Sequence, residues 1–243
     1  MIPKLLLQTS PNARPDPGLR RHLVAQLGPG WTYRYFTDAD ILQYFRDNPL
    51  SGFENIEHRW HAMPSGPLKA DLFRYYFLYV NGGVFLDYDA MIYTGISKYC
   101  EQYDLFSVAT DHNKMFNGFV GCRPLSPIMQ TMLHDAYWIN VVVLSNRHHL
   151  LLENMNKIVR GHTGSEKIFL FEEQVDHKQG VVVDNNTLIA VHYYKHKVIP
   201  NPGALKLWTL YITQPQMIWM WTVATARSVT CYITACVKSL LPK

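Results

Sequence analysis

The fold is indicated most clearly by residues 65–89, which read SGPLKADLFRYYFLYVNGGVFLDYD. Ser65 is placed to cap the start of a helix, and Gly82 is placed to end it. Between these two positions, residues 68–80 are apolar on nearly every side. A helix that is apolar all round is buried inside its domain. The stretch therefore predicts a buried central helix.

A short apolar strand is predicted directly after this helix, over residues 84–86, and it leads into Asp87-Tyr88-Asp89. Side chains alternate along a strand, so we expect both aspartates to point to one face and Tyr88 to the other. Two carboxylates so close repel each other unless a hard divalent cation neutralises them, and oxygen ligands suit Mg²⁺ or Mn²⁺. In open α/β sheets, ligands bind beyond the carboxyl ends of the strands. The pattern favours a metal site, with a solvated acidic turn as the alternative.

Three charges interrupt the predicted central helix, at Lys69, Asp71 and Arg74. Asp71 and Arg74 are spaced i, i+3, so they share one helical face. Burying a charge without a partner costs several kcal/mol. The two residues are therefore either a buried ion pair that ties the helix to the sheet, or hydrogen-bonding groups for a sugar or a ribose. Gly82 and Gly83 let the backbone approach a ligand or adopt a positive φ, although a simple helix end is compatible with them too.

Composition narrows the class of protein. The chain has 243 residues, of which 48% are hydrophobic and 17% are charged, and its formal net charge is +4. This excludes a disordered chain, which could not bury enough apolar surface to offset its ordering entropy, and it excludes several large domains. So small a positive excess, without dense clusters of lysine and arginine, argues against nucleic acid as a partner. The four cysteines form no C-x-x-C pair of the kind that marks zinc or redox sites.

Alternating strand and helix patterns along residues 1–200 predict a single α/β domain with a mostly parallel sheet. The further predicted strands are residues 2–8, 31–36, 105–109, 118–121, 181–183 and 188–191. The further predicted helices are residues 19–27, 38–45, 127–137 and 149–159, with Asp38 as the cap of the second.

The pattern changes after residue 200, and we predict a separate apolar, helical tail over residues 201–243. Residues 207–226 carry no charge. Residues 217–237 come close to the roughly 20 predominantly apolar residues that a membrane-spanning helix needs. Three alternatives stay open for the tail: a helix in or on a membrane, a helix docked on the domain, and a spurious or truncated terminus.

Residues 69–89, from Lys69-Ala70-Asp71 to Asp87-Tyr88-Asp89, resemble the DXD-containing glycosyltransferases. More narrowly, they resemble the group of the yeast initiating α-1,6-mannosyltransferase and the inositol-phosphoceramide mannosyltransferases, in glycosyltransferase family 32. The opening residues 2–9 are similar to the first strand of that family, with Ser10 where a tryptophan is usual. Residues 117–119 are similar to its sheet-edge segment, and residues 163–165 resemble a Thr-Gly-Pro element that has lost its proline.

This resemblance implies a GT-A fold, in which helices flank a Rossmann-like mixed sheet and the D-x-D motif holds Mn²⁺ or Mg²⁺ on the diphosphate of the donor. By position in the motif, Asp89 would ligate the metal directly. Asp87 would contact the ribose or the donor sugar and assist the metal shell. Asp71 and Arg74 would hold hydroxyls of the donor sugar, and Asp87, Asp89 and Arg74 would form the catalytic set.

The same resemblance assigns several further residues. Gly82, Gly83 and Asn117 would lie at the donor site. In such enzymes a late histidine often completes the metal shell. His192, which follows the predicted strand 188–191, is the first candidate, and His162 is the second.

The implied function is a metal-dependent, retaining transfer of a hexose from a GDP- or UDP-linked donor to a glycan or glycolipid. Mannose is the first candidate for the hexose. The implied location is membrane-associated, in the endomembrane system or Golgi of a eukaryote or otherwise at the cytoplasmic face of a membrane, with the tail as the contact. One alternative is a haloacid-dehalogenase-like phosphatase, in which Asp87 would be the nucleophile and Asp89 the general acid and base. That motif wants Gly-Thr or Gly-Val where this chain has Ala90-Met91. The other alternative is a homologue that binds a sugar nucleotide without catalysis.

Overall fold

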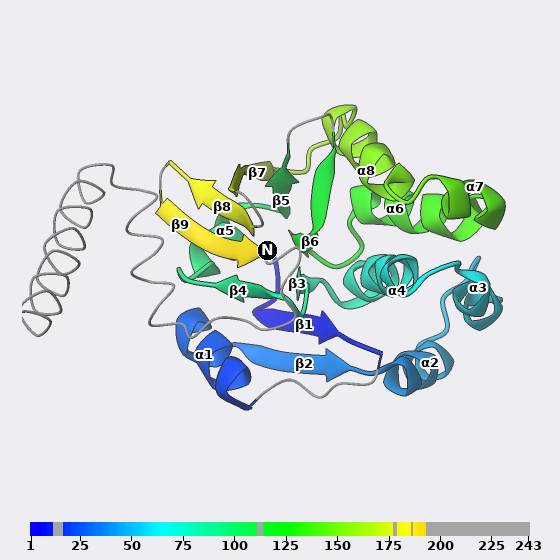
Figure 1. Cartoon of the computed structure of the whole chain (residues 1–243), viewed down its shortest axis with the longest axis horizontal. Coiled ribbons are helices and arrows are strands. Elements are labelled where there is room, and N and C mark those ends of the chain that lie inside the picture. Colours follow the sequence, from blue (N-terminus) through cyan, green and yellow to red (C-terminus); the bar gives the residue numbers. More distant parts are fainter. Residues whose placement is uncertain (12–16, 111–113, 177–178, 186, 193–243) are drawn as a thin grey trace, which may run out of the picture. The chain divides into compact units, whose positions relative to one another are not determined.

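The computed structural model describes residues 1–11, 17–110, 114–176, 179–185 and 187–192 (Figure 1). The predicted tail, residues 201–243, lies outside the described residues, so the alternatives for it stay predictions. Among the helices that are described, none combines the length and the apolar composition that crossing a lipid bilayer requires.

Helices and strands are interspersed along the chain, and the strands form one mixed sheet, which confirms an α/β fold. The helices are α1 (Pro17–Leu27), α2 (Asp38–Asp47), α3 (Ile56–Ala62), α4 (Gly66–Asn81), α5 (Ser97–Gln102), α6 (Pro127–Trp138), α7 (Val141–Asn146) and α8 (Leu150–Arg160). The strands are β1 (Leu5–Thr9), β2 (Thr32–Phe36), β3 (Gly83–Leu86), β4 (Ala90–Ile92), β5 (Leu105–Ala109), β6 (Met115–Cys122), β7 (Ile168–Asp176), β8 (Gln179–Asp184) and β9 (Thr187–His192). Each element predicted before residue 193 is present, whereas α3, α5, α7, β4 and β7 have no predicted counterpart.

Helix α4 is the buried central helix that the sequence predicts. It begins after Ser65, whose backbone is extended as in an N-cap but whose side chain makes no capping hydrogen bond. It ends at Gly82, where φ is +65° and the N–H donates to the carbonyl of Leu78 at 2.8 Å. Tyr76 and Phe77 are completely buried. Helix α4 packs against β3, β6 and α6, and this packing places its polar side chains near the end of β3.

Helix α2 begins differently from the prediction, because Thr37 rather than Asp38 is its N-cap. The hydroxyl of Thr37 accepts from the N–H of Asp40 at 3.3 Å, and the carboxylate of Asp40 accepts from the N–H of Thr37 at 2.9 Å. This reciprocal pair is a capping box, which needs an acidic or amide side chain three residues after the cap. Asp38 is left facing the pocket described below.

The strands form one mixed sheet in the order β2-β1-β3-β6-β5-β7-β8-β9-β4. The pairs β1–β2, β1–β3 and β5–β7 are parallel, and the other five pairs of the described strands are antiparallel. The expectation of a mostly parallel sheet is therefore wrong, because β6, β8 and β9 each return beside the preceding strand without a crossover helix. Strand β6 also lies between β3 and β5, so residues 117–119 are not at a sheet edge.

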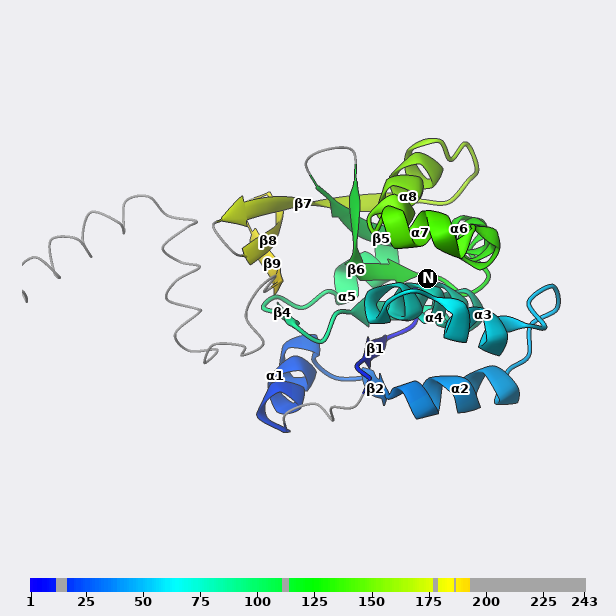
Figure 2. The ribbon, with the colours of Figure 1, turned by 45° about the vertical axis from the view of Figure 1, so that its right-hand side comes forward.

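This sheet has to curl. Strands β3 and β4 are joined by residues 87–89 alone, yet they stand six positions apart in the strand order. Six strand spacings of about 4.8 Å would separate them by about 29 Å in a flat sheet. The four steps from Leu86 to Ala90 reach at most about 14 Å. Figure 2 shows the strands turning from β7 through β8 and β9 to β4. Because β9 pairs with β4, it is brought close to residues 87–89, which join β3 to β4.

Candidate functional site

A tight turn carries the two aspartates. Strand β3 ends at Leu86, and the N–H of Ala90 donates to the carbonyl of Asp87 at 3.0 Å, which closes a β-turn over residues 87–90. Tyr88, at the centre of the turn, is exposed. The carboxylates of Asp87 and Asp89 come to one place, as the sequence predicts. The cause is the turn, whereas the prediction relied on side-chain alternation along a strand.

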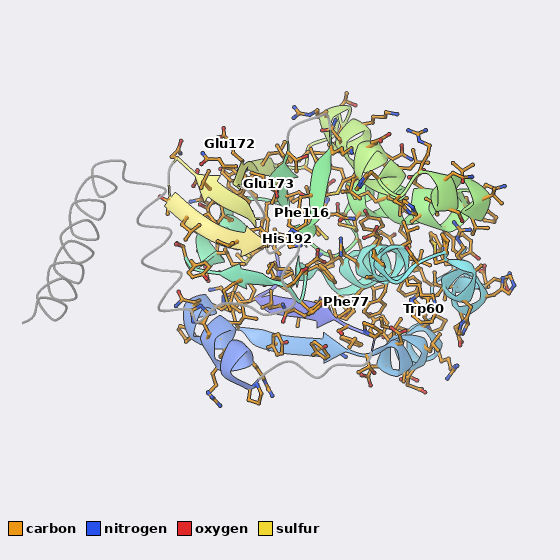
Figure 3. All side chains as sticks on the ribbon, viewed as in Figure 1. Trp60, Phe77, Phe116, Glu172, Glu173 and His192 are labelled. Atoms are coloured by element: carbon orange, nitrogen blue, oxygen red, sulfur yellow. The ribbon has the colours of Figure 1, made fainter. Side chains whose placement is uncertain are left out.

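His192 reaches this turn from the end of the described chain. Strand β9 pairs with β4, and the register places His192 opposite Ala90, next to Asp89. Its Nε2 lies 3.1 Å from Oδ1 of Asp89 and 3.8 Å from Oδ2 of Asp87. The ring of Phe116 lies against the imidazole, with 4.4 Å between the ring centroids (Figure 3). We call Asp87, Asp89 and His192 the Asp-His cluster.

The donor set of the Asp-His cluster fits a divalent cation. One ligand atom from each of its three residues lies within 4.8 Å of the other two. The two carboxylates repel each other at this separation, and a cation between them would remove that cost. Carboxylate oxygens suit both Mg²⁺ and Mn²⁺, whereas the imidazole nitrogen is a poor ligand for Mg²⁺, which is bound almost entirely by oxygen.

His162, the second predicted histidine ligand, is not part of the Asp-His cluster. Its Nε2 lies 3.8 Å from Oε2 of Glu166, in the segment between α8 and β7. That carboxylate is almost completely buried, and it also accepts from the N–H of Ile128 at 3.3 Å. The structure therefore places His162 beside Glu166, whose carboxylate contacts the first turn of α6.

Arg74 anchors Asp87 from helix α4. Its Nη2 donates to Oδ1 of Asp87 at 2.9 Å. Its Nη1 donates to the carbonyl of Asn117 at 2.7 Å and lies 3.2 Å from Oδ1 of Asp71. The guanidinium carbon lies 3.8 Å from the ring centroid of Phe85, and Arg74 is only 2% exposed. The ion pair that ties the helix to the sheet is therefore present, and a contact of Arg74 with donor hydroxyls stays a prediction.

Asp71 lies one helical turn before Arg74 and is buried. The amide of Asn117 donates to Oδ1 of Asp71 at 2.9 Å, and it also donates to the hydroxyl of Tyr75 at 2.9 Å. Burial raises the pKa of Asp71 to about 6, although Arg74 pulls the value down; the nearby Asp87 raises it further. Perturbed carboxyl groups inside pockets are candidates for ligand binding or catalysis.

The raised pKa of Asp71 predicts a loss of stability as the pH rises. Its pKa is about 6 in the folded chain against 3.8 ordinarily, so the folded state binds the proton more tightly. The contribution to stability is therefore complete below about pH 4 and is lost as the pH rises through about 6. Because Asp71→Asn removes this titration, the free energy of unfolding of the variant should gain on the wild type between those pH values. Urea unfolding across this range measures the difference, and parallel pH profiles would contradict the assignment.

Further residues hold Asp87 and were not predicted. The amide of Gln8, which is 1% exposed, donates to the carbonyl of Asp87 at 3.0 Å, and the hydroxyl of Tyr33 donates to Gln8 at 2.8 Å. The N–H of Asp87 donates to the carbonyl of Gly118 at 2.7 Å. Of these residues, only Gln8 was conspicuous in the sequence, because it is a polar side chain at the end of an apolar strand. The others depend on strand pairing, which no local pattern contains.

Gly82 and Gly83 have a packing role in the structure, and a role at the donor site stays a prediction. They stand at the start of β3, whereas Asp87 follows its end. A Cβ on Gly82 would lie 2.6 Å from Cδ of Pro124, and a Cβ on Gly83 would lie 2.8 Å from the carbonyl oxygen of Leu5. With φ values of +65° and +106°, both positions also need the conformational freedom of glycine.

A pocket of about 730 Å³ opens beside the Asp-His cluster. Its volume is within the roughly 300–1,000 Å³ that is typical of small-molecule sites. The walls come from the end of β1, the starts of α2, α4 and α8, and the turn after β3. Asp71, Arg74, Asn117 and the whole Asp-His cluster line it. Ser10, at the position where the resemblance expects tryptophan, lines it as well.

Comparison with known proteins gives one family match. A comparison with curated protein sequences finds no match. Among solved structures, "PaToxG Glycosyltransferase" is 12% identical with a TM-score of 0.44, over 66% of this chain and 68% of that chain. "Crystal Structure of A197 from STIV" is 13% identical with a TM-score of 0.32, over 81% of this chain and 97% of that chain. Residues 22–106, which include Asp71, Arg74, Asp87 and Asp89, match the model of the glycosyltransferase sugar-binding region containing a DXD motif.

Proposed function

We propose that this chain is a metal-dependent glycosyltransferase that moves a hexose from a nucleotide-sugar donor to a glycan or glycolipid. The observation that carries the proposal is the meeting of Asp87, Asp89 and His192 at the wall of a pocket of about 730 Å³. The family match of residues 22–106 supports the same class of enzyme. Mannose as the hexose, GDP or UDP as the carrier, and retention of configuration are proposed on the resemblance of residues 69–89.

The residues of the site have separate tasks in this proposal. A cation held by the Asp-His cluster would neutralise the charge that builds up on the leaving diphosphate. Arg74 holds Oδ1 of Asp87, which leaves Oδ2 directed toward His192. Asp71 lines the pocket with a carboxylate that can accept hydrogen bonds from hydroxyls of the donor sugar. Asn117 fixes the orientation of Asp71 from β6.

The phosphatase alternative needs Asp87 as a nucleophile that attacks phosphorus. In this chain Oδ1 of Asp87 accepts from Arg74 at 2.9 Å, and its main chain is held by Gln8 and Gly118. These contacts orient Asp87 and would serve a nucleophile as well as a metal ligand. The transferase is favoured instead by Ala90-Met91, where the phosphatase motif wants Gly-Thr or Gly-Val, and by the family match of residues 22–106.

The acceptor and the location belong to the same proposal. A glycolipid acceptor would agree with a membrane-associated enzyme, in the Golgi or endomembrane system of a eukaryote or otherwise at the cytoplasmic face of a membrane. The tail, residues 201–243, would supply the membrane contact through its uncharged segment. Binding of the full chain to vesicles, compared with a chain that ends at residue 200, separates this contact from donor chemistry.

A panel of GDP- and UDP-linked hexoses tests the function. Each donor is incubated with the protein and Mn²⁺, and the release of nucleoside diphosphate is measured. We expect release from at least one hexose donor, abolished by EDTA and restored by added Mn²⁺. Release of phosphate from p-nitrophenyl phosphate without nucleoside diphosphate would establish the phosphatase. Metal-dependent binding of a nucleoside diphosphate, without sugar release or transfer from any donor, would establish the non-catalytic homologue.

A further inference from the structure

We propose that Gly118 is a positioning residue that sets the places of two ligands in the Asp-His cluster, Asp87 and His192. The inference rests on the proposed function, because it concerns the residues that would hold the cation. Gly118 lies in β6 and has no side chain of its own to offer a ligand. Its contribution is the space that a missing Cβ leaves.

That space is taken first by Asp87. A Cβ on Gly118 would lie 2.1 Å from Oδ2 of Asp87, which is far inside van der Waals contact. The carboxylate cannot turn aside freely, because Arg74 holds Oδ1 at 2.9 Å. The main chain cannot withdraw either, since the N–H of Asp87 donates to the carbonyl of Gly118 at 2.7 Å. The absence of a side chain at Gly118 therefore allows Oδ2 of Asp87 to occupy the position in which it faces His192.

The same space is taken from the other side by Phe116. A Cβ on Gly118 would lie 2.2 Å from Cζ of this ring and 2.4 Å from Cε2. Phe116 is 6% exposed, so the ring has little room to move outward. Its other side lies against the imidazole of His192, with 4.4 Å between centroids and 32° between the ring planes. A displaced Phe116 would therefore displace His192.

An irregularity in β6 brings these groups together. Along β5 the paired residues are Phe106 and Val108, while their partners along β6 are Gly121 and Phe116. The extra residues of β6 form a bulge, and bulges beside functional sites redirect side chains. In this bulge Phe116 lies over Gly118, and the amide of Asn117 turns to Asp71.

The test compares Gly118→Ala with Gly121→Ala, a matched control in the same strand. A Cβ on Gly121 would also clash, at 2.4 Å from Cε1 of Phe106, but the three atoms nearest to it all belong to Phe106. Mn²⁺ affinity is measured by isothermal titration calorimetry, and folding is checked by urea unfolding. We expect Gly118→Ala to weaken Mn²⁺ binding by about 10–100-fold, the usual range for residues that orient ligands. Gly121→Ala should lose stability but keep its Mn²⁺ affinity.

Equal Mn²⁺ affinity of Gly118→Ala and wild type would overturn the inference. If Gly118→Ala does not fold, Phe116→Leu tests the same contact, because it removes the ring beside His192 and introduces no clash. A several-fold loss of Mn²⁺ affinity in Phe116→Leu would support the inference, and unchanged affinity would overturn it. Failure of the proposed function looks different: the wild type would then bind Mn²⁺ but release no nucleoside diphosphate from any hexose donor. The comparison of Mn²⁺ affinities would still decide the inference, and a wild type that binds no Mn²⁺ would overturn it.

Discussion

Replacement of Arg74 by lysine is expected to lower Mn²⁺-dependent release of nucleoside diphosphate by about a hundredfold or more. The guanidinium contacts Asp71, Asp87 and Asn117 at once, with two nitrogens in one plane. A lysine ammonium is a point charge and cannot reach all three groups in this geometry. Asp87 would then lose its orientation within the Asp-His cluster, and the buried Asp71 and the partly exposed Asp87 would face each other with less compensation.

The same change should lower the free energy of unfolding by about 2 kcal/mol, the loss of a hydrogen bond to a charged group, because lysine keeps the positive charge but cannot make all three contacts. Arg46→Lys is the matched control. Arg46 also donates two hydrogen bonds to a carboxylate, that of Glu57, but its side chain is 54% exposed. An exposed pair contributes about 1 kcal/mol or less. Urea unfolding and donor hydrolysis of both variants give the comparison, and an Arg74→Lys variant with wild-type turnover would show that Arg74 is only a packing residue.

Asp89→Asn is expected to weaken Mn²⁺ binding by about a hundredfold or more, since even outer residues of metal sites are worth about 10–100-fold. Its Oδ1 lies 3.1 Å from Nε2 of His192, and its side chain is 26% exposed. The amide keeps the shape of the carboxylate and loses its charge. The folded chain without metal should keep its stability or gain a little, because the repulsion from Asp87 disappears.

Calorimetric titration measures the affinity, and thermal unfolding with and without Mn²⁺ gives an independent readout. A ligand at a hundred times its dissociation constant adds about 2.7 kcal/mol to the folded state, so the variant should lose most of the stabilisation by Mn²⁺. Asp38→Asn is the control, because Asp38 lines the same pocket outside the cluster. Wild-type Mn²⁺ affinity in Asp89→Asn would remove Asp89 from the metal site.

The central helix could be predicted to within a residue because its limits are local. Ser65 and Gly82 mark the two ends, and the apolar character of the segment requires burial. Strand β4 could not be predicted, since three residues are too few for a periodic pattern. Strand β7 was hidden by Glu172 and Glu173, which interrupt the apolar run, although Glu173 is only 8% exposed in the fold.

The site could be predicted in part for the same reason. Asp71, Arg74 and the aspartate pair lie within one short stretch, where helix spacing and the strand end already place them. His192 was a candidate only through the resemblance, because its meeting with Asp89 depends on a strand pairing across a hundred residues. The role of Gly118 depends on atoms of Asp87 and Phe116 that meet only in the folded sheet.

Two separate requirements fix the length of the link between β3 and β4. Metal chemistry asks for two carboxylates within reach of one ion, and the turn over residues 87–90 supplies them. The fold requires, separately, that three residues join β3 and β4, which occupy the third and the ninth position in the strand order. A longer link would allow β4, and β9 paired with it, to lie farther from the end of β3, and His192 would then lie farther from Asp87. The three-residue length of the D-x-D motif is therefore set by the arrangement of the strands as well as by metal binding.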